Sequence, residues 1–206
     1  MVHSDDYGLV LPPKIAPVQV MVIPIAQHKE GVLEKANELY NKLSACGVRV
    51  KLDDSDNSPG WKYAEYEMKG VPVRIELGPR DIEAGNCVIA TRHNGEKTVV
   101  SLENIGETVK EALETVRKGM FERALANREA HTYRCDSIEE IATALEENGD
   151  GFVYAPWCGC EECEDEVKAK AGVGSRCIYD AVSVEGKKCV CCGKDAVHNV
   201  VWAKAY

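Results

Sequence analysis

Thiol groups are the most concentrated reactive chemistry of this 206-residue chain, because seven of its ten cysteines lie in the last 49 residues. Four of them form two pairs, Cys158 with Cys163 and Cys189 with Cys192, and 25 residues separate the pairs. Gly193 follows the second pair, and a glycine there allows the backbone to turn beneath an ion. Since a closed zinc site takes four thiolates at about 2.3 Å from two such turns, the spacing predicts one structural Zn²⁺ with no open position for catalysis.

Other groups near these pairs leave alternatives for the ligand set. Cys160 and Cys191 lie within the same two segments and could each replace a named thiol, Cys191 through a tighter Cys-x-Cys grip. His131 and His198 are less suitable ligands, because six thiols already compete for four places. Cys177 is expected to pack in the small core beside the metal.

The cysteines could instead form disulfides or a redox pair, but neither interpretation fits the rest of the chain. The N-terminus lacks an apolar signal core and a basic region, and a chain of this length does not need disulfide staples. A redox Cys-x-x-Cys normally opens a helix, whereas a turn follows Cys192. Reduced thiols, and the absence of a run of 18 apolar residues, indicate a cytoplasmic protein without a membrane span.

The composition is that of an acidic globular protein. The chain carries 34 acidic and 25 basic residues, a net charge of −9, and 45% of its residues are hydrophobic. Broad binding to nucleic acid relies on clustered lysine and arginine. The charge balance therefore argues against a protein that coats nucleic acid, without excluding a local binding site.

Strands and helices alternate before the cysteine pairs. Apolar runs and alternating patterns predict strands, and apolar stripes with helical spacing predict helices. The expected strands are 18–24, 48–52, 71–77, 87–92 and 97–102, and the expected helices are 30–46, 58–69 and 104–130. Ser58 and Pro59 suit the N-cap and first position of the second helix. This order predicts an α/β fold with a mixed β-sheet flanked by helices.

A smaller unit is expected to begin near residues 128–136. Its expected elements are a helix over 138–145, a solvated charged helix over 161–168, and strands over 151–155 and 197–203. Ser137 is expected to cap the first of these helices, with Glu140 completing a capping box. The cysteine-bearing unit is therefore predicted to be a small α+β domain. At the other end of the chain, two consecutive prolines predict an extended linker over residues 8–14.

Two stretches outside the cysteines carry a resemblance to a known family. They are Gly8–Pro17 and Lys69–Asp81, and together with the cysteine pairs and the final Ala203–Tyr206 they occur in the family's order. The whole chain thereby resembles the C-terminal part of prolyl-tRNA synthetases of the archaeal and eukaryote-like type. The resemblance implies a linker left from the end of the class II catalytic domain (1–15), a class II aminoacyl-tRNA synthetase anticodon-binding domain (16–130) and a C-terminal zinc-binding domain (131–206).

The resemblance also implies a function. The family is a proline–tRNA ligase, which uses ATP to attach proline to tRNA in protein synthesis and is expected to be a homodimer. Its C-terminal portion recognises the anticodon of tRNA(Pro). The catalytic core that holds ATP and proline precedes the matching segment, so this chain alone is expected to be inactive and to have no catalytic residues. The alternatives are a stand-alone, non-catalytic RNA-binding or regulatory module, and a zinc-stabilised interaction domain.

The segment 61–92 is, by resemblance, the one that reads the anticodon. Proline anticodons share guanine at the second and third positions, and guanine offers donors to a carboxylate and acceptors to arginine or lysine. Residues of these types in the segment are Lys62, Glu65, Lys69, Arg74, Glu76, Arg80 and Arg92. The anticodon-binding candidates are Glu65, Lys69, Arg74, Arg80 and Arg92, with Arg80 on phosphate or a structural carboxylate.

Simpler interpretations stand beside these roles. Arg74 and Glu76 share one face of the expected strand, where both could merely be solvated. Trp61 is expected to pack at the edge of the core rather than to stack on a base. His28 lies between a strand and a helix and is expected to be an ordinary loop histidine. The sequence contains no Ser-His-Asp arrangement, phosphate-binding glycine loop or paired carboxylates that predict catalysis.

Overall fold

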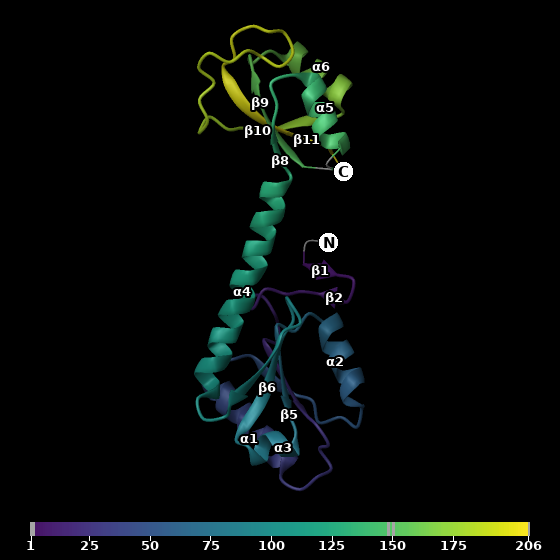
Figure 1. The fold of residues 1–206 in the computed structure, drawn as a ribbon, viewed down its shortest axis with the longest axis vertical. Coiled ribbons are helices and arrows are strands. Elements are labelled where there is room, and N and C mark those ends of the chain that lie inside the picture. Colours follow the sequence, from purple (N-terminus) through teal and green to yellow (C-terminus); the bar gives the residue numbers. More distant parts are fainter. Residues whose placement is uncertain (1–2, 148, 150, 206) are drawn as a thin grey trace. The chain divides into compact units, whose positions relative to one another are not determined.

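The computed structural model of the chain describes residues 3–147, 149 and 151–205. Tyr206, which belongs to the final segment of the resemblance, lies outside the described residues, as do residues 1–2, 148 and 150. The chain divides after Glu122 into two compact units, the N-terminal unit and the C-terminal unit (Figure 1). The division falls within one helix, α4 (Ile105–Ala130), and the domain boundary near residue 130 stays a prediction.

A five-stranded mixed sheet forms the centre of the N-terminal unit. Its strands, in spatial order, are β4 (Val50–Leu52), β3 (Val20–Pro24), β5 (Val73–Leu77), β6 (Asn86–Thr91) and β7 (Lys97–Ser101). β3 pairs in parallel with β4 and β5, whereas β5, β6 and β7 pair antiparallel. The mixed sheet predicted from the sequence is thereby confirmed, with strand ends that differ only slightly from the expected ones.

Helices cover both faces of this sheet. Besides α4 they are α1 (Val32–Ala45), α2 (Pro59–Met68) and the short α3 (Pro79–Glu83). Neighbouring residues of β3 point to opposite faces: Val20 and Val22 pack with α1 and α4, and Met21 and Ile23 with tyrosines of α2. Figure 1 shows α2 and α4 on opposite sides of β5 and β6. The helix that carries Trp61, Glu65 and the beginning of the candidate segment therefore lies on the face of the sheet opposite α1 and α4.

A short hairpin approaches the C-terminal end of α2. Its strands are β1 (Ser4–Asp5) and β2 (Gly8–Leu9), so the first residues of the expected linker are paired rather than free. A Cβ at Gly8 would lie 2.4 Å from the Cα of Met68, and a Cβ at Gly70 would lie 2.6 Å from the Cβ of Leu9. Both glycines have positive φ, so they provide the room and the backbone conformation that this close approach needs.

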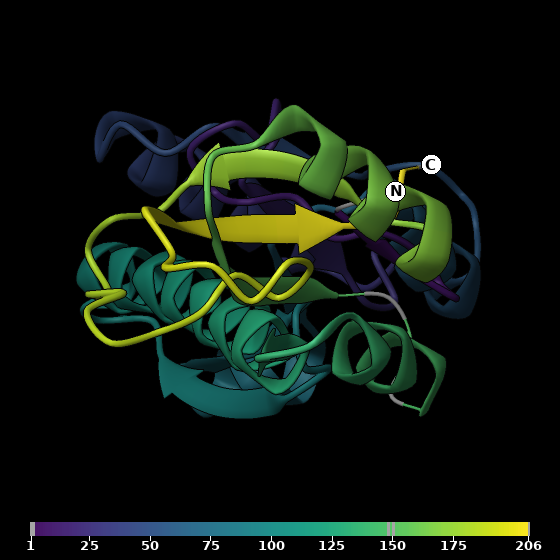
Figure 2. The same ribbon diagram turned by 90° about the horizontal axis from the view of Figure 1, so that it is seen from above.

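The C-terminal unit is a four-stranded sheet with two helices. Its strands, in spatial order, are β10 (Gly174–Ile178), β11 (His198–Ala203), β9 (Phe152–Trp157) and β8 (Thr132–Arg134), and its helices are α5 (Ile138–Glu147) and α6 (Glu161–Ala171). Figure 2 shows β11, in yellow, between β10 and β9. The core contains the fully buried Trp202 with apolar residues of α5, α6 and β9. Ser137 Oγ accepts from the N–H of Glu140 at 3.2 Å, which confirms the predicted helix cap.

The expected position of Cys177 is wrong. This residue lies on the edge strand β10 and is exposed instead of packed in the core. The pairing of β10 with β11 shifts register between Ser175 and Cys177, and most of the strand is open to solvent. Val167 of α6 and Val173 fill the core instead. No helix in the described part of the chain has both the length and the apolar composition to span a bilayer.

Candidate functional site

Two segments of the C-terminal unit bring four thiols together. Cys158 follows β9 and Cys163 lies in the first turn of α6, whereas Cys189 and Cys192 lie in a turn that ends at Gly193 with a φ of 70°. The four sulfur atoms all lie within 4.8 Å of one another. Cys158 Sγ is 3.7 Å from Cys163 Sγ and 3.7 Å from Cys192 Sγ. A tetrahedron with metal–sulfur bonds of about 2.3 Å has edges of about 3.8 Å, so the thiols are spaced to hold one metal ion.

The two extra thiols of these segments have other partners. Cys160 Sγ lies 2.6 Å from a carboxylate oxygen of Glu162, and Cys191 Sγ lies 3.0 Å from one of Glu166. Burial, followed by the neighbouring Glu166, raises the pKa of the Cys191 thiol to about 11. Both thiols therefore serve as hydrogen-bond donors outside the cluster of four.

The ionisation of Cys192 suits a metal ligand. A hydrogen bond from the backbone of Lys194 lowers the pKa of the Cys192 thiol to about 7, so its thiolate forms readily near neutral pH. The histidines that could have replaced a thiol are held elsewhere. His131 Nδ1 is 2.7 Å from the carbonyl oxygen of Asn127 on α4, and His198 Nδ1 is 3.3 Å from Asp180.

In the N-terminal unit, α2 presents a row of side chains to solvent. Trp61, Glu65 and Lys69 are spaced four residues apart, which places them along one face of the helix. Trp61 is 50% exposed, so part of its ring is covered, as expected at the edge of the core, and part is open to solvent. Glu65 and Lys69 form an ion pair at 2.5 Å. These three residues are called the α2 row below.

A compact group of charges and one aromatic ring, the Arg74 cluster, is formed by Tyr63, Glu67, Arg74, Glu76 and Lys97, and its α2 members lie on the other flank of that helix from the α2 row. Arg74 donates to Glu67 at 2.8 Å and to Glu76 at 3.0 Å, and Lys97 pairs with Glu76 at 2.8 Å. The guanidinium of Arg74 lies 4.2 Å, and the ammonium of Lys97 5.1 Å, from the centre of the Tyr63 ring. Burial, with Glu76 nearby, raises the pKa of Tyr63 to about 12. The cluster thus presents cationic donors and anionic acceptors side by side.

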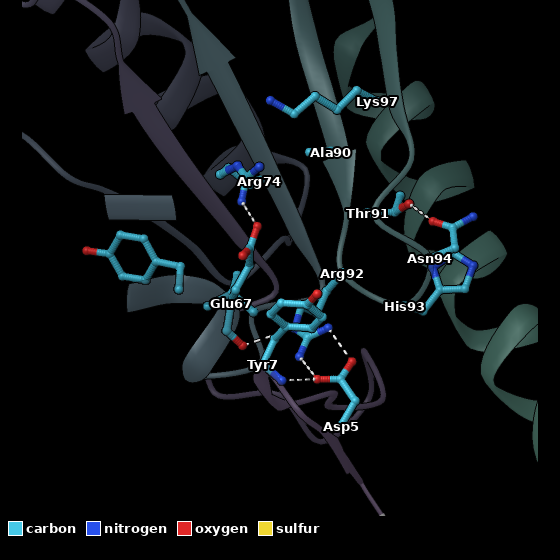
Figure 3. A pocket seen from close by; sticks show the side chains of 13 residues that line it. Asp5, Tyr7, Glu67, Arg74, Ala90, Thr91, Arg92, His93, Asn94 and Lys97 are labelled. Atoms are coloured by element: carbon cyan, nitrogen blue, oxygen red, sulfur yellow. Dashed lines mark hydrogen bonds and ion pairs between the residues drawn. The ribbon is translucent and has the colours of Figure 1, made fainter. Parts of the chain in front are cut away.

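The Arg74 cluster borders a cavity of about 380 Å³ (Figure 3). Arg74 and Lys97 line the cavity on one side, and Arg92 and Asp5 on another. Two nitrogens of Arg92 contact the Asp5 carboxylate at 2.5 and 2.8 Å, and its Nε donates to the backbone oxygen of Glu67 at 3.0 Å. The hydrogen bond from Arg92 holds the pKa of Asp5 at about 2, so this pair is fully charged at neutral pH.

Comparison with known proteins identifies these two regions. Residues 19–112 match the family model described as an anticodon binding domain, and residues 138–206 match the model described as the C-terminal part of prolyl-tRNA synthetase. Over its whole length the chain is 56% identical to a proline–tRNA ligase of Lachnoclostridium phytofermentans, 54% to one of Ruminiclostridium cellulolyticum and 52% to one of Clostridium botulinum. The chain belongs to the prolyl-tRNA synthetase family. It spans 43% of the length of these relatives and corresponds to their C-terminal part.

The two matched regions include all the anticodon-binding candidates and the four predicted metal ligands. The anticodon-binding match covers Glu65, Lys69, Arg74, Arg80 and Arg92, and the C-terminal match covers the four clustered thiols. The structure pairs Glu65 with Lys69 on one flank of α2, whereas Arg74 contacts Tyr63 and Glu67 on the other flank. It places Arg80 at the start of α3, exposed and without a side-chain partner among the described residues. Arg92 lies at the cavity but has its guanidinium turned onto Asp5.

Sequence reasoning missed Tyr63, Glu67 and Lys97 as members of the Arg74 cluster. Lys97 lies across from Ala90 on β6, and Ala90 lies across from Arg74 on β5, so the three occupy one row across the sheet. The small side chain of Ala90 leaves room for the two long cations above it. The observed register of the β6–β7 hairpin, which pairs Ala90 with Lys97, is what places Lys97 next to Arg74.

Proposed function

We propose that residues 16–130 read the anticodon of tRNA(Pro), and that the chain acts as the anticodon-recognising part of a proline–tRNA ligase. The observation that carries this proposal is the Arg74 cluster on one flank of α2 and the α2 row on the other, within a segment that matches an anticodon binding domain. Both groups combine cations and carboxylates in a small area. Their mixed charge suits the edge of a base better than a run of phosphates.

Guanine is the base that this chemistry fits best. Arg74 and Lys97 can donate to its O6 and N7 atoms, and Glu67 can accept from its N1–H and N2–H groups. In the α2 row, Lys69 and Glu65 offer the same two kinds of group. The exposed ring of Trp61 supplies a surface on which a splayed base can stack. Arg80, exposed at the start of α3, is assigned to a phosphate of the same loop. A local site of this kind is compatible with the net charge of −9.

The first expected result concerns RNA specificity. The chain should bind an anticodon stem-loop with guanine at the second and third anticodon positions more tightly than one with adenine at both. One bidentate contact discriminates by about 1–3 kcal/mol, so each wrong base should weaken binding by about 5- to 150-fold. Fluorescence anisotropy at one fixed salt concentration measures both affinities, since salt alone changes the affinity of any RNA contact.

Two arginine variants localise this effect. Arg74→Ala should reduce the preference for guanine, because it removes the donor at the centre of the Arg74 cluster. Arg117→Ala, which removes an exposed arginine paired with Glu114 on α4, should keep the preference. Equal binding of the two RNAs by the unchanged chain would refute the proposed function. Equal preference in the chain and in Arg74→Ala would refute only the choice of Arg74.

For the C-terminal unit, we propose that the four clustered thiols hold a structural Zn²⁺. Its support is the donor set of four sulfurs at tetrahedral spacing, which is typical of closed structural zinc sites. Bound zinc would stabilise the turn that carries Cys189 and Cys192 and fix it to the start of α6. Residues 131–206 are accordingly assigned as a zinc-binding domain.

The remaining assignments follow from the longer relatives. We assign activation of proline with ATP, and its transfer to tRNA, to the part of such proteins that this chain does not span, and propose a cytoplasmic homodimer for the whole. The catalytic core would then be a partner of the present chain. A stand-alone RNA-binding module would show the same specificity without that partner. A zinc-stabilised interaction domain would show no preference between the guanine and adenine stem-loops.

A further inference from the structure

The guanidinium of Arg92 is committed to contacts within the protein. Its side chain is only 7% exposed, and its two terminal nitrogens form a two-pronged contact with the carboxylate of Asp5. Its Nε donates to the backbone oxygen of Glu67. All three guanidinium nitrogens of Arg92 donate within the protein, so none of them is left without a partner for a base edge. Arg74 is also buried, but its Nη2 has no partner among the described residues and remains able to donate.

The partner of Arg92 belongs to a segment far away in the sequence. Asp5 lies on the β1–β2 hairpin, 87 residues before Arg92. The hairpin is seated directly on the end of α2, where Gly8 leaves no room for a Cβ beside Met68. Next to it, the N–H of Leu11 donates to the backbone oxygen of Gly70 at 3.4 Å. The Arg92–Asp5 pair therefore fastens a closely fitted hairpin to the last turn of α2.

Glu67, in that last turn, connects this contact to the proposed reading site. Its backbone oxygen accepts from Arg92, and its carboxylate accepts from Arg74 at 2.8 Å. One residue thus receives a hydrogen bond from each arginine, and Figure 3 shows both contacts along the same edge of the cavity. Moving Arg92 would shift the backbone of Glu67 and with it the acceptor that orients Arg74.

We propose that Arg92 is a positioning residue rather than a base reader: with Asp5 it clamps the hairpin onto α2, and through Glu67 it sets the orientation of Arg74. This inference rests on the proposed function, because it assigns to Arg74 the reading of guanine. It changes the expected role of Arg92 and adds the β1–β2 hairpin to the determinants of specificity.

The variant Asp5→Asn separates the two roles of Arg92. It removes one negative charge and releases the guanidinium, so a base-reading Arg92 would bind RNA equally well or more tightly. A clamping Arg92 would lose its contact with the hairpin. We then expect the preference for guanine over adenine stem-loops to fall by about tenfold, which is within the discrimination that one bidentate contact provides. Asp6→Asn is the matched control, because it makes the same change of charge at an exposed neighbouring residue and should keep the preference.

A second variant tests the clamp without altering charge. Gly8→Ala would place a Cβ 2.4 Å from the Cα of Met68 and push the hairpin away from α2. It should reduce the preference for guanine as Asp5→Asn does. Gly85→Ala is its control, since Gly85 also has a positive φ but a Cβ there would meet nothing within 4 Å. Thermal melting of each variant shows whether the sheet and α2 remain folded.

The outcomes distinguish this inference from the proposed function. If the unchanged chain binds both stem-loops equally, the proposed function fails and the clamp with it. If the unchanged chain prefers guanine and both Asp5→Asn and Gly8→Ala keep that preference, the clamp is wrong and anticodon reading survives. A reduced preference in both variants, with full preference in Asp6→Asn and Gly85→Ala, supports the clamp.

Discussion

Replacing Cys158 with serine is expected to remove the bound metal and to unfold much of the C-terminal unit, while the N-terminal unit keeps its fold. Cys158 is central to the cluster, with sulfur–sulfur distances of 3.7 Å to thiols of both segments. Structural zinc contributes apparent binding free energies of about 10–16 kcal/mol, which the folded state gains because the unfolded chain has no preformed site. The long loop of residues 179–197, which carries Cys189 and Cys192, has few buried apolar residues to hold it otherwise.

Two measurements test this expectation. Metal analysis after dialysis should give one zinc per chain for the unchanged protein and close to none for Cys158→Ser. Calorimetry should show an early transition in the variant that chelator treatment of the unchanged protein reproduces. Cys160→Ser is the matched control, because its sulfur lies outside the cluster and contacts Glu162. Full zinc and unchanged melting in Cys158→Ser would overturn the ligand assignment. Loss of zinc in Cys160→Ser would show that Cys160 is a ligand in place of one of the four clustered thiols.

Features encoded by neighbouring residues could be predicted from the sequence. The N-cap at Ser58 with Pro59 behind it marks the start of α2, and the hydrogen bond from the N–H of Trp61 to Ser58 Oγ confirms it. The strands and long helices follow from period-two and helical patterns. The four clustered thiols also follow from local spacing, because each pair comes from a single turn. In the first two cases the relevant contacts lie within a few residues along the chain, and in the third the local spacing marks each pair of thiols, although the two pairs meet over 34 residues.

Features that depend on distant contacts could not be predicted in this way. Glycines such as Gly8 and Gly70 signal turns, but nothing local shows that each makes room for the other segment. The partner of Arg92 lies 87 residues away, so the sequence leaves its guanidinium free to be assigned to RNA. Cys177 is misplaced because a register shift in an edge strand is invisible in a short apolar pattern. The membership of Lys97 in the Arg74 cluster needs the pairing of three strands.

A buried ion pair underlies the last prediction. Lys62 is 2% exposed and Asp53 is 7% exposed, although lysine and aspartate are rarely buried. Lys62 Nζ donates to the backbone oxygen of Asp53 at 2.9 Å and lies 3.5 Å from its carboxylate. The same carboxylate accepts from Tyr66 at 2.8 Å and from Ser55 at 2.6 Å. This network attaches α2 to the loop after β4, so Lys62, although it lies in the candidate RNA segment, is assigned to stability.

Lys62→Met is expected to lower the free energy of unfolding of the N-terminal unit by about 3–5 kcal/mol, because it leaves the Asp53 charge buried without its cation. The effect should depend on pH. Burial opposes ionisation of Asp53, but hydrogen bonds from Ser55 and Tyr66 and the charge of Lys62 outweigh it and lower its pKa. A lowered pKa gives stability that is present above the ordinary aspartate range and is lost as the pH falls through the folded-state value. Since the variant lacks the contribution of Lys62, its deficit should shrink in that acidic range.

Urea unfolding of both proteins at neutral and acidic pH measures this deficit. Lys110→Met is the matched control, because Lys110 is an exposed helical lysine paired with Glu107, and such surface pairs contribute at most about 1 kcal/mol. A Lys62→Met variant as stable as the Lys110→Met control would show that the buried pair contributes nothing to the attachment of α2. A deficit that stays constant as the pH falls would show that Lys62 stabilises the helix through packing of its aliphatic chain, and not through the charge of Asp53.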